Sequence, residues 1–205
     1  MKYKFVTFFV IGLSLIVQLT ACSGSDKSPA GVQYDPQPYF SLAEYFNTEI
    51  ERLELDSAEI LKTVEINGSV ESKSVRIENW KNEFAPFIDA DINKSAWVNS
   101  YAVESTDSTT SYISKEPNLK TKHIHIKFGE DGSPVSIAIE NQVENWIYTA
   151  REKLTYYPDS YYEIFKEQDI RIVGHNQYRI RGEWKTPSAA AAAMAVDHQN
   201  KAYNR

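Results

Sequence analysis

Apolar residues near the start of the folded region recur at the spacing of a helix. Ser41 followed by Glu44 forms a capping box, which satisfies backbone donors at a helix start. The positions that follow place four apolar side chains on one face: Leu42, Phe46, Ile50 and Leu53. This pattern predicts an amphipathic helix that needs a partner surface.

A second helix is predicted over about residues 79–90. Its apolar face would comprise Trp80, Phe84, Phe87 and Ile88. Pro86 interrupts the periodic segment, because proline lacks the amide hydrogen and its ring crowds the preceding turn. We therefore expect this helix to be short or kinked.

The rest of the body alternates apolar and polar residues, which is typical of strands. The segments are 62–66, 69–77, 101–105, 110–115, 119–128, 135–140, 145–157, 161–173 and 177–185. Asn67-Gly68 predicts a hairpin turn. The connections are mostly too short for parallel crossovers. The predicted fold is α+β, with an N-terminal helix and a short second helix packed on a curved, mostly antiparallel sheet of about seven to nine strands.

Composition narrows the class of protein. The chain has 205 residues, a net charge of -6, and 13% aromatic residues. The aromatic content disfavours general disorder, and the acidic balance disfavours nucleic-acid binding. We divide the chain into a signal peptide (1–21), a flexible tether (22–38), one folded domain (39–186) and an alanine-containing tail (187–205).

The first 22 residues carry a targeting pattern. Lys2 and Lys4 precede an apolar run from Phe5 to Val17, which is too short to span a membrane as a helix. Leu19-Thr20-Ala21-Cys22 follows and resembles the lipobox of bacterial lipoproteins. The resemblance implies cleavage before Cys22 and acylation of this cysteine, so the protein would be anchored in the cell envelope. In the sorting rule of such lipoproteins, Asp directly after the cysteine favours retention in the inner membrane. Because Ser23 follows Cys22 here, we expect the protein to be anchored in the outer membrane.

The folded body matches no named family by its motifs. It resembles the many uncharacterised envelope lipoproteins in having a helix and a strand meander behind a lipobox. Its architecture also resembles the half-barrel of periplasmic lipoprotein carriers, and this likeness transfers no functional residue.

Two segments have the spacing of weak metal sites. His123 and His125 should share one face of a strand, although Lys122 and Lys127 flank them and would repel a cation. Asp89 to Asn93 begins like a calcium loop, but the pattern then fails, and an Asx-type turn is the alternative. The sequence predicts no metal and no cofactor.

Cations and aromatic residues of the later strands mark a possible face for a ligand or partner. Its residues are Arg171, Arg179, Arg181, Lys127, Trp146 and Tyr148. Such a stripe could meet anionic lipid, glycan or an acidic partner. The alternative is a solvated sheet face with cross-strand ion pairs.

The residues support three functional hypotheses. The chain lacks the sequence motifs of serine hydrolases, phosphate-binding loops and zinc proteases. The first hypothesis is therefore a non-catalytic lipoprotein that serves as an accessory or binding subunit of an outer-membrane complex, with an envelope protein partner. The second is a carrier holding an acyl chain beside Ile124, Ile126, Ile137, Ile139 and Trp146. The third is an envelope glycan hydrolase.

Overall fold

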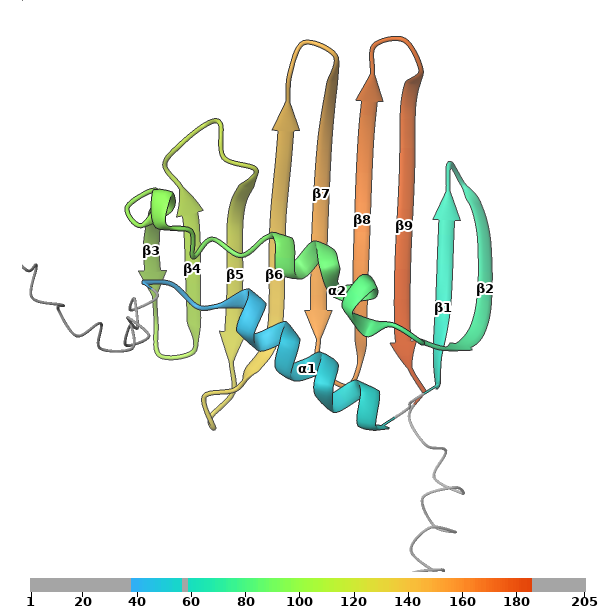
Figure 1. Ribbon diagram of the computed structural model, residues 1–205, viewed down its shortest axis with the longest axis horizontal. Helices are drawn as coiled ribbons and strands as arrows, with labels where there is room; N and C mark the ends of the chain where they lie inside the picture. The colour runs from blue at the N-terminus through green and yellow to red at the C-terminus, as the bar shows by residue number, and fades with distance from the viewer. Residues whose placement is uncertain (1–37, 57–58, 186–205) are drawn as a thin grey trace, which may run out of the picture. The chain divides into compact units, whose positions relative to one another are not determined.

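Two helices lie across one face of an antiparallel sheet (Figure 1). The structure is a computed structural model, and it describes residues 38–56 and 59–185. The predicted signal peptide, the predicted acylation site Cys22, nearly all of the predicted tether and the C-terminal tail lie outside these residues. Within the described residues, no helix has the length and apolar character needed to cross a membrane.

The helices are α1 (Leu42–Asp56) and α2 (Trp80–Asp89), followed by a short 3-10 helix, η1 (Ser95–Trp97). The strands are β1 (Glu59–Ile66), β2 (Ser69–Arg76), β3 (Tyr101–Ser105), β4 (Thr109–Ser114), β5 (Thr121–Phe128), β6 (Pro134–Glu144), β7 (Tyr148–Tyr157), β8 (Tyr161–Ile170) and β9 (Gly174–Trp184). The predicted α+β class, with two helices and an antiparallel sheet, is confirmed.

The sheet is open and has the order β2-β1-β9-β8-β7-β6-β5-β4-β3. Strands β3 to β9 form a continuous meander. The β1–β2 hairpin then pairs with β9, the last strand, with Ile60 opposite Trp184. The segment that contains α2 and η1 crosses the sheet from the β2 edge to the β3 edge (Figure 1).

Aromatic side chains fill the space between the helices and the sheet. Phe46 of α1 lies 4.8 Å from Phe87 of α2 and 5.1 Å from Tyr156 of β7, measured between ring centroids. Further along, Trp80 stacks on Trp184 at 5.9 Å. The predicted core face of α1 is confirmed, since its buried residues are Leu42, Phe46, Ile50 and Leu53.

Local signals in the sequence define several element boundaries. The hydroxyl of Ser41 accepts a hydrogen bond from the Glu44 backbone N–H, as expected for a helix cap. Asn67 and Gly68 both have positive φ, as a type I′ turn requires. The second helix runs from Trp80 to Asp89 and contains Pro86 within it.

Two strands are shorter than their apolar patterns predict. The segment 145–157 becomes a strand only from Tyr148, because the Asn145 side chain accepts hydrogen bonds from the N–H groups of Ile147 and Tyr148 and forms a turn. The segment 161–173 is a strand only to Ile170, and Val173 donates to its carbonyl. Apolar residues at both ends therefore lie in turns.

Candidate functional site

The helices leave part of their own side of the sheet uncovered. Strands β6 to β9 extend beyond α1 and α2 toward the β6–β7 and β8–β9 turns (Figure 1). A pocket of about 330 Å³ lies on these strands. We call it the amide pocket, and its lining residues are Lys120, Asn141, Gln142, Val143, Tyr148, Ala150, Glu152, Lys166 and Gln168.

A nearly buried carboxylate lines the amide pocket. The Glu152 side chain is 12% exposed, and its Oε2 accepts a 2.8 Å hydrogen bond from Asn141 Nδ2. Lys120 Nζ lies 3.9 Å from the same oxygen. Asn141 is 4% exposed, and its Oδ1 has no hydrogen-bond partner among the described residues. The pocket therefore contains fixed polar groups, and not all of them are satisfied.

Lys166 supplies a second cation. It lies directly opposite Glu152 in the register of β7 and β8. Lys166 is half-buried and lines the pocket, and its ammonium group forms no ion pair or hydrogen bond with the described residues. One carboxylate and two ammonium groups leave the pocket with a net charge of about +1, which favours an anionic group in a ligand.

The remaining lining residues provide hydrogen bonds and an apolar surface. Gln168 lies opposite Ala150, and Tyr148 lies at the outer end of the same strand as Ala150. Side-chain amides can both donate and accept hydrogen bonds, and an aromatic ring offers a flat apolar surface. These groups together suit a small ligand rich in hydroxyl groups that also carries a negative charge.

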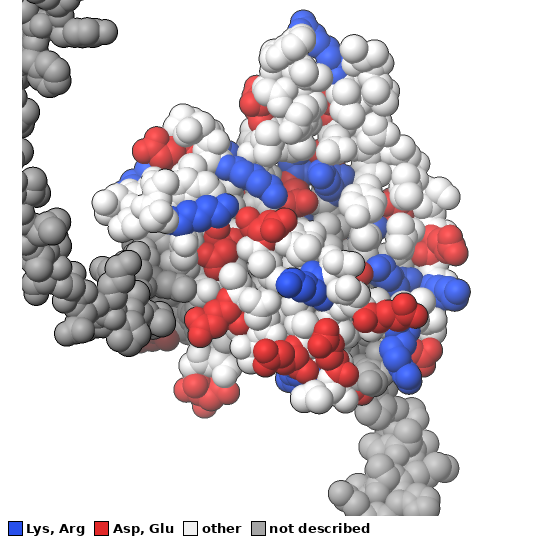
Figure 2. Space-filling view, viewed as in Figure 1, with Lys and Arg blue, Asp and Glu red and all other residues white. Residues whose placement is uncertain are grey.

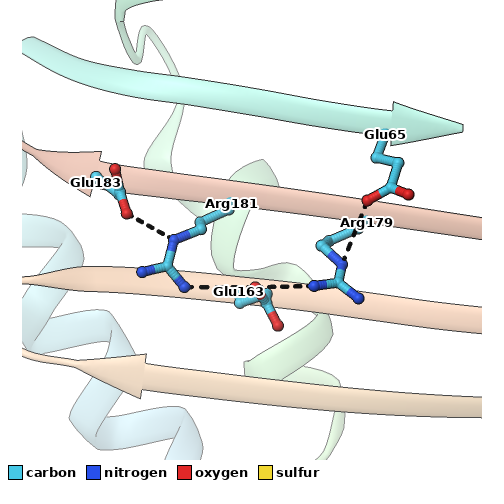
Figure 3. A network of polar contacts seen from close by, with 5 residues as sticks. All are labelled: Glu65, Glu163, Arg179, Arg181 and Glu183. Carbon is cyan, nitrogen blue, oxygen red and sulfur yellow. Dashed lines mark hydrogen bonds and ion pairs between the residues drawn. The ribbon is translucent and has the colours of Figure 1, made fainter. Parts of the chain in front are cut away.

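The other side of the sheet carries the arginines of the predicted cationic face. Figure 3 shows Arg179 and Arg181 of β9 among three glutamates. Glu163 lies between them, 3.8 Å from Arg179 and 3.4 Å from Arg181. Glu65 lies 3.7 Å from Arg179 Nε, and Glu183 lies 2.7 Å from Arg181 Nε.

The glutamates change what these arginines can do. Two guanidinium groups meet three carboxylates, so this part of the surface is not cationic. Arg179 also lies over the Phe165 ring, and Arg181 lies 3.7 Å from the centroid of Tyr161. The pairing follows the alternative that the sequence left open, a solvated sheet face with cross-strand ion pairs.

The structure disperses the six residues of the predicted face. Arg179 and Arg181 share one side of β9, while Lys127 lies on β5, separated from β9 by three strands. Tyr148 lines the amide pocket. Trp146 and Arg171 lie together in neighbouring turns, where the Arg171 guanidinium is 3.5 Å from the Trp146 carbonyl oxygen.

The histidine pair shares a face of β5, as its spacing predicts. The ring centroids of His123 and His125 are 6.2 Å apart, and His125 Nδ1 is hydrogen-bonded to the Ser111 hydroxyl at 2.8 Å. His175 is paired with Asp169 on β8 and β9. In the part of the chain that the structure describes, no three His, Cys, Asp or Glu residues are grouped to hold a metal ion.

The calcium-like segment has a structural role. Asp91 Oδ1 accepts from the Asn93 N–H at 2.7 Å, which forms the Asx turn. Its Oδ2 accepts from the Ala43 N–H at 2.7 Å and from the Ser41 hydroxyl at 3.3 Å. This carboxylate therefore caps α1 from a distant segment, where it also meets the positive end of the helix dipole.

Two glutamates on the helices form hydrogen bonds that stabilise the packing of the helices on the sheet. Glu49 of α1 accepts a hydrogen bond from the Tyr156 hydroxyl, and Glu83 of α2 accepts one from the Tyr162 hydroxyl. Arg52 and Lys62 pair with these carboxylates. Burial, followed by the neighbouring glutamate, raises the pKa of both tyrosines well above the usual range.

No sequence pattern predicts the amide pocket. Its central residues Asn141, Glu152 and Lys166 come from three neighbouring strands, and no motif links them. The only sequence signal for the pocket is that polar residues occupy positions in these strands where the alternating pattern would place apolar ones. Comparisons with protein-family models, curated proteins and solved structures find no match to this chain.

Proposed function

We propose that the protein is a non-catalytic, lipid-anchored binding subunit of the outer membrane, and that it binds a hydroxyl-rich anionic ligand, such as a carboxylated sugar unit, in the amide pocket. The observation that carries this proposal is the half-buried Lys166 beside the Asn141–Glu152 pair. An ammonium group without a protein partner can be paired by a ligand carboxylate, and such charge-assisted hydrogen bonds are strong.

The lipobox supports the location. Acylation of Cys22 would hold the folded body at the membrane, because each buried methylene group of an acyl chain contributes about 0.8 kcal/mol. The proposed ligand chemistry is that of envelope glycans, which are rich in hydroxyl groups and often carry acidic substituents.

The pocket chemistry supports binding over glycan hydrolysis. Most glycoside hydrolases use two carboxyl groups on either side of the scissile bond. Glu152 is the one carboxylate among the residues that line the amide pocket, and it is already engaged by Asn141.

Core packing weighs against the acyl-carrier hypothesis. The four isoleucines expected to line its cavity, Ile124, Ile126, Ile137 and Ile139, are buried in the core. Trp146, expected beside them, is an exposed turn residue. The aromatic residues of α1 and α2 occupy the space in which an acyl chain would lie.

An NMR titration of the protein with glucuronate tests the proposal, with glucose as the neutral counterpart. We expect glucuronate to shift the signals of amide-pocket residues and glucose to shift them less. Lys166→Met should weaken glucuronate binding about tenfold, because a hydrogen bond to a charged group contributes about 1.5 kcal/mol or more. Lys153→Met is the matched control, since Lys153 lies on the opposite side of β7 and is largely exposed.

Native mass spectrometry of the lipoprotein, gently extracted from its own membrane, provides a second test. An added small-molecule mass that Lys166→Met removes would support ligand binding. A stoichiometric protein partner that remains bound without any small molecule would favour an accessory subunit that acts through protein contacts. In the NMR titration, signal shifts caused by glucuronate that are spread over the surface, or confined to the side of Arg179 and Arg181, would contradict the amide pocket as the binding site.

A further inference from the structure

Four large apolar side chains are exposed together on two neighbouring turns. Trp146 and Ile147 lie between β6 and β7, and their exposed fractions are 78% and 43%. Ile172 and Val173 lie between β8 and β9, and their exposed fractions are 94% and 71%. We call these four residues the apolar tip.

The two turns are joined to each other. Tyr148 lies opposite Ile170 where β7 and β8 meet the turns. Beyond that pair, the Arg171 N–H donates to the Ile147 carbonyl at 3.1 Å, and the Arg171 guanidinium donates to the Trp146 carbonyl at 3.5 Å. The Asn145 side chain fixes the first turn through two backbone hydrogen bonds. The apolar tip is therefore formed before any partner binds.

The tip projects from one end of the sheet. The long β6–β7 and β8–β9 hairpins reach past their neighbours (Figure 1), and this end is mostly uncharged, with a basic group at its extremity and acidic groups on its flanks (Figure 2). Elsewhere on the same side, acidic and basic groups are mixed. Large exposed apolar patches rimmed by polar residues mark interaction sites.

We propose that the apolar tip inserts into the interfacial region of the lipid bilayer and holds the anchored protein upright. Tryptophan prefers the membrane interface, where its ring meets both apolar and polar surroundings. The aliphatic side chains gain free energy on leaving water, and the Arg171 guanidinium suits a lipid phosphate. A standard protein interface needs about 800 Å² on each partner, and a narrow pair of turns suits a lipid surface better.

The anchor brings the membrane within reach. Sixteen residue steps separate Cys22 from Pro38, and an extended chain covers at most about 55 Å over this distance. Strand β7 has ten residues and is about 33 Å long. The acyl chains and the apolar tip can therefore enter the same membrane. This inference goes beyond ligand binding and depends on the proposed anchor only for proximity to the membrane.

Tryptophan fluorescence of the acylated protein in phosphatidylethanolamine and phosphatidylglycerol vesicles tests the proposal. The lipids carry bromine high in their acyl chains, where it quenches indoles at the interface. The chain has four tryptophans, and we expect quenching of one component that disappears in Trp146→Phe. Trp97→Phe is the matched control and should leave that quenching unchanged, because Trp97 packs against the core near β3. Equal quenching in wild type and Trp146→Phe, or none, would overturn the proposal.

Measuring the partition of the protein between water and vesicles separates the contribution of the apolar tip to membrane binding from that of the acyl anchor. Cys22→Ala removes the acylation site, and we expect this chain to bind the same vesicles weakly. Adding Ile172→Ser should lower its partition coefficient about tenfold, because one large aliphatic side chain no longer leaves water. Leu55→Ser removes an equally exposed side chain from the end of α1 and should have no effect. Equal effects of the two substitutions would contradict insertion of the tip even if ligand binding in the amide pocket holds.

Discussion

Gly182 illustrates how a single residue makes room for an interaction between a helix and the sheet. It lies opposite Tyr162 in the register of β8 and β9, and the Tyr162 ring occupies the space where a side chain at position 182 would lie. The ring is fully buried and its hydroxyl donates to Glu83 of α2. The absent side chain thus allows Tyr162 to reach the helix.

Substitution of Gly182 should therefore lower stability. We expect Gly182→Ala to reduce the free energy of unfolding by about 1–3 kcal/mol, because the added methyl group overlaps the Tyr162 ring. Urea unfolding measures the change. Combined with Tyr162→Leu, the same glycine substitution should cost less than in the wild-type background, since the smaller side chain relieves the overlap. Equal costs in the two backgrounds would show that the ring is not the cause.

The α1 start shows how one element depends on another. The N-terminal N–H groups of a helix have no partner within the helix. The Ser41 hydroxyl satisfies one of them, and the Asp91 carboxylate, from the segment after α2, satisfies a second at Ala43. The two helices are thus tied together by a side chain that the sequence pattern assigned to a turn.

Removal of this carboxylate tests the tie. Asp91→Ala should lower the free energy of unfolding by about 1–2 kcal/mol, the usual cost of losing a helix cap. Asp89→Ala is the control, because Asp89 is exposed and its side chain has no hydrogen bond or ion pair among the described residues. It should change stability by less than about 0.5 kcal/mol. Thermal unfolding of both variants gives the comparison, and similar losses would argue against the cap.

Local sequence patterns predict where the helices and strands lie better than they predict which of these elements pack side by side. The spacing of Leu42, Phe46 and Ile50 predicts the buried face of α1, since helical periodicity depends only on nearby residues. Pairing of β1 with β9 depends on residues more than a hundred positions apart, such as Ile60 and Trp184, and alternation says nothing about which strands meet. The amide pocket escaped prediction for the same reason, because Asn141, Glu152 and Lys166 become neighbours only through the sheet.

At the scale of the whole molecule, burial holds several tyrosine hydroxyl groups in their neutral form. Burial raises the pKa of Tyr45, Tyr112, Tyr156, Tyr162 and Tyr178. It also raises the pKa of Tyr101 to about 12. In the unfolded chain these hydroxyl groups would titrate near the ordinary value of about 10.

Stability should therefore fall as pH rises above about 10. Unfolded tyrosines release protons there while folded ones retain them, so the unfolded state binds fewer protons and gains free energy. Tyr101 should contribute a loss of up to about 1.4 kcal/mol per pH unit between its unfolded and folded pKa values, from about pH 10 to about pH 12. Urea unfolding at several alkaline pH values measures the slope.

The contribution of Tyr101 to the loss of stability at alkaline pH can be measured separately. Tyr101→Phe removes a hydrogen bond from its hydroxyl to the Thr121 carbonyl and should lower stability at neutral pH. The same variant should lose stability less steeply above about pH 10, because one titrating group is gone. A slope that Tyr101→Phe does not alter would assign the alkaline loss to other groups.

The pairing of β1 with β9 also sets the order in which the protein can be completed. The first hairpin of the domain ends at Arg76, and its place in the sheet is beside a strand that begins only at Gly174. A chain that emerges N-terminus first therefore lacks the pairing partner of β1 until almost the whole domain has appeared. Distant pairings of this kind fold slowly. Under the export that we propose, this delay would leave the chain unfolded while it crosses the membrane, and the last strand pairing of the sheet would form only on the far side.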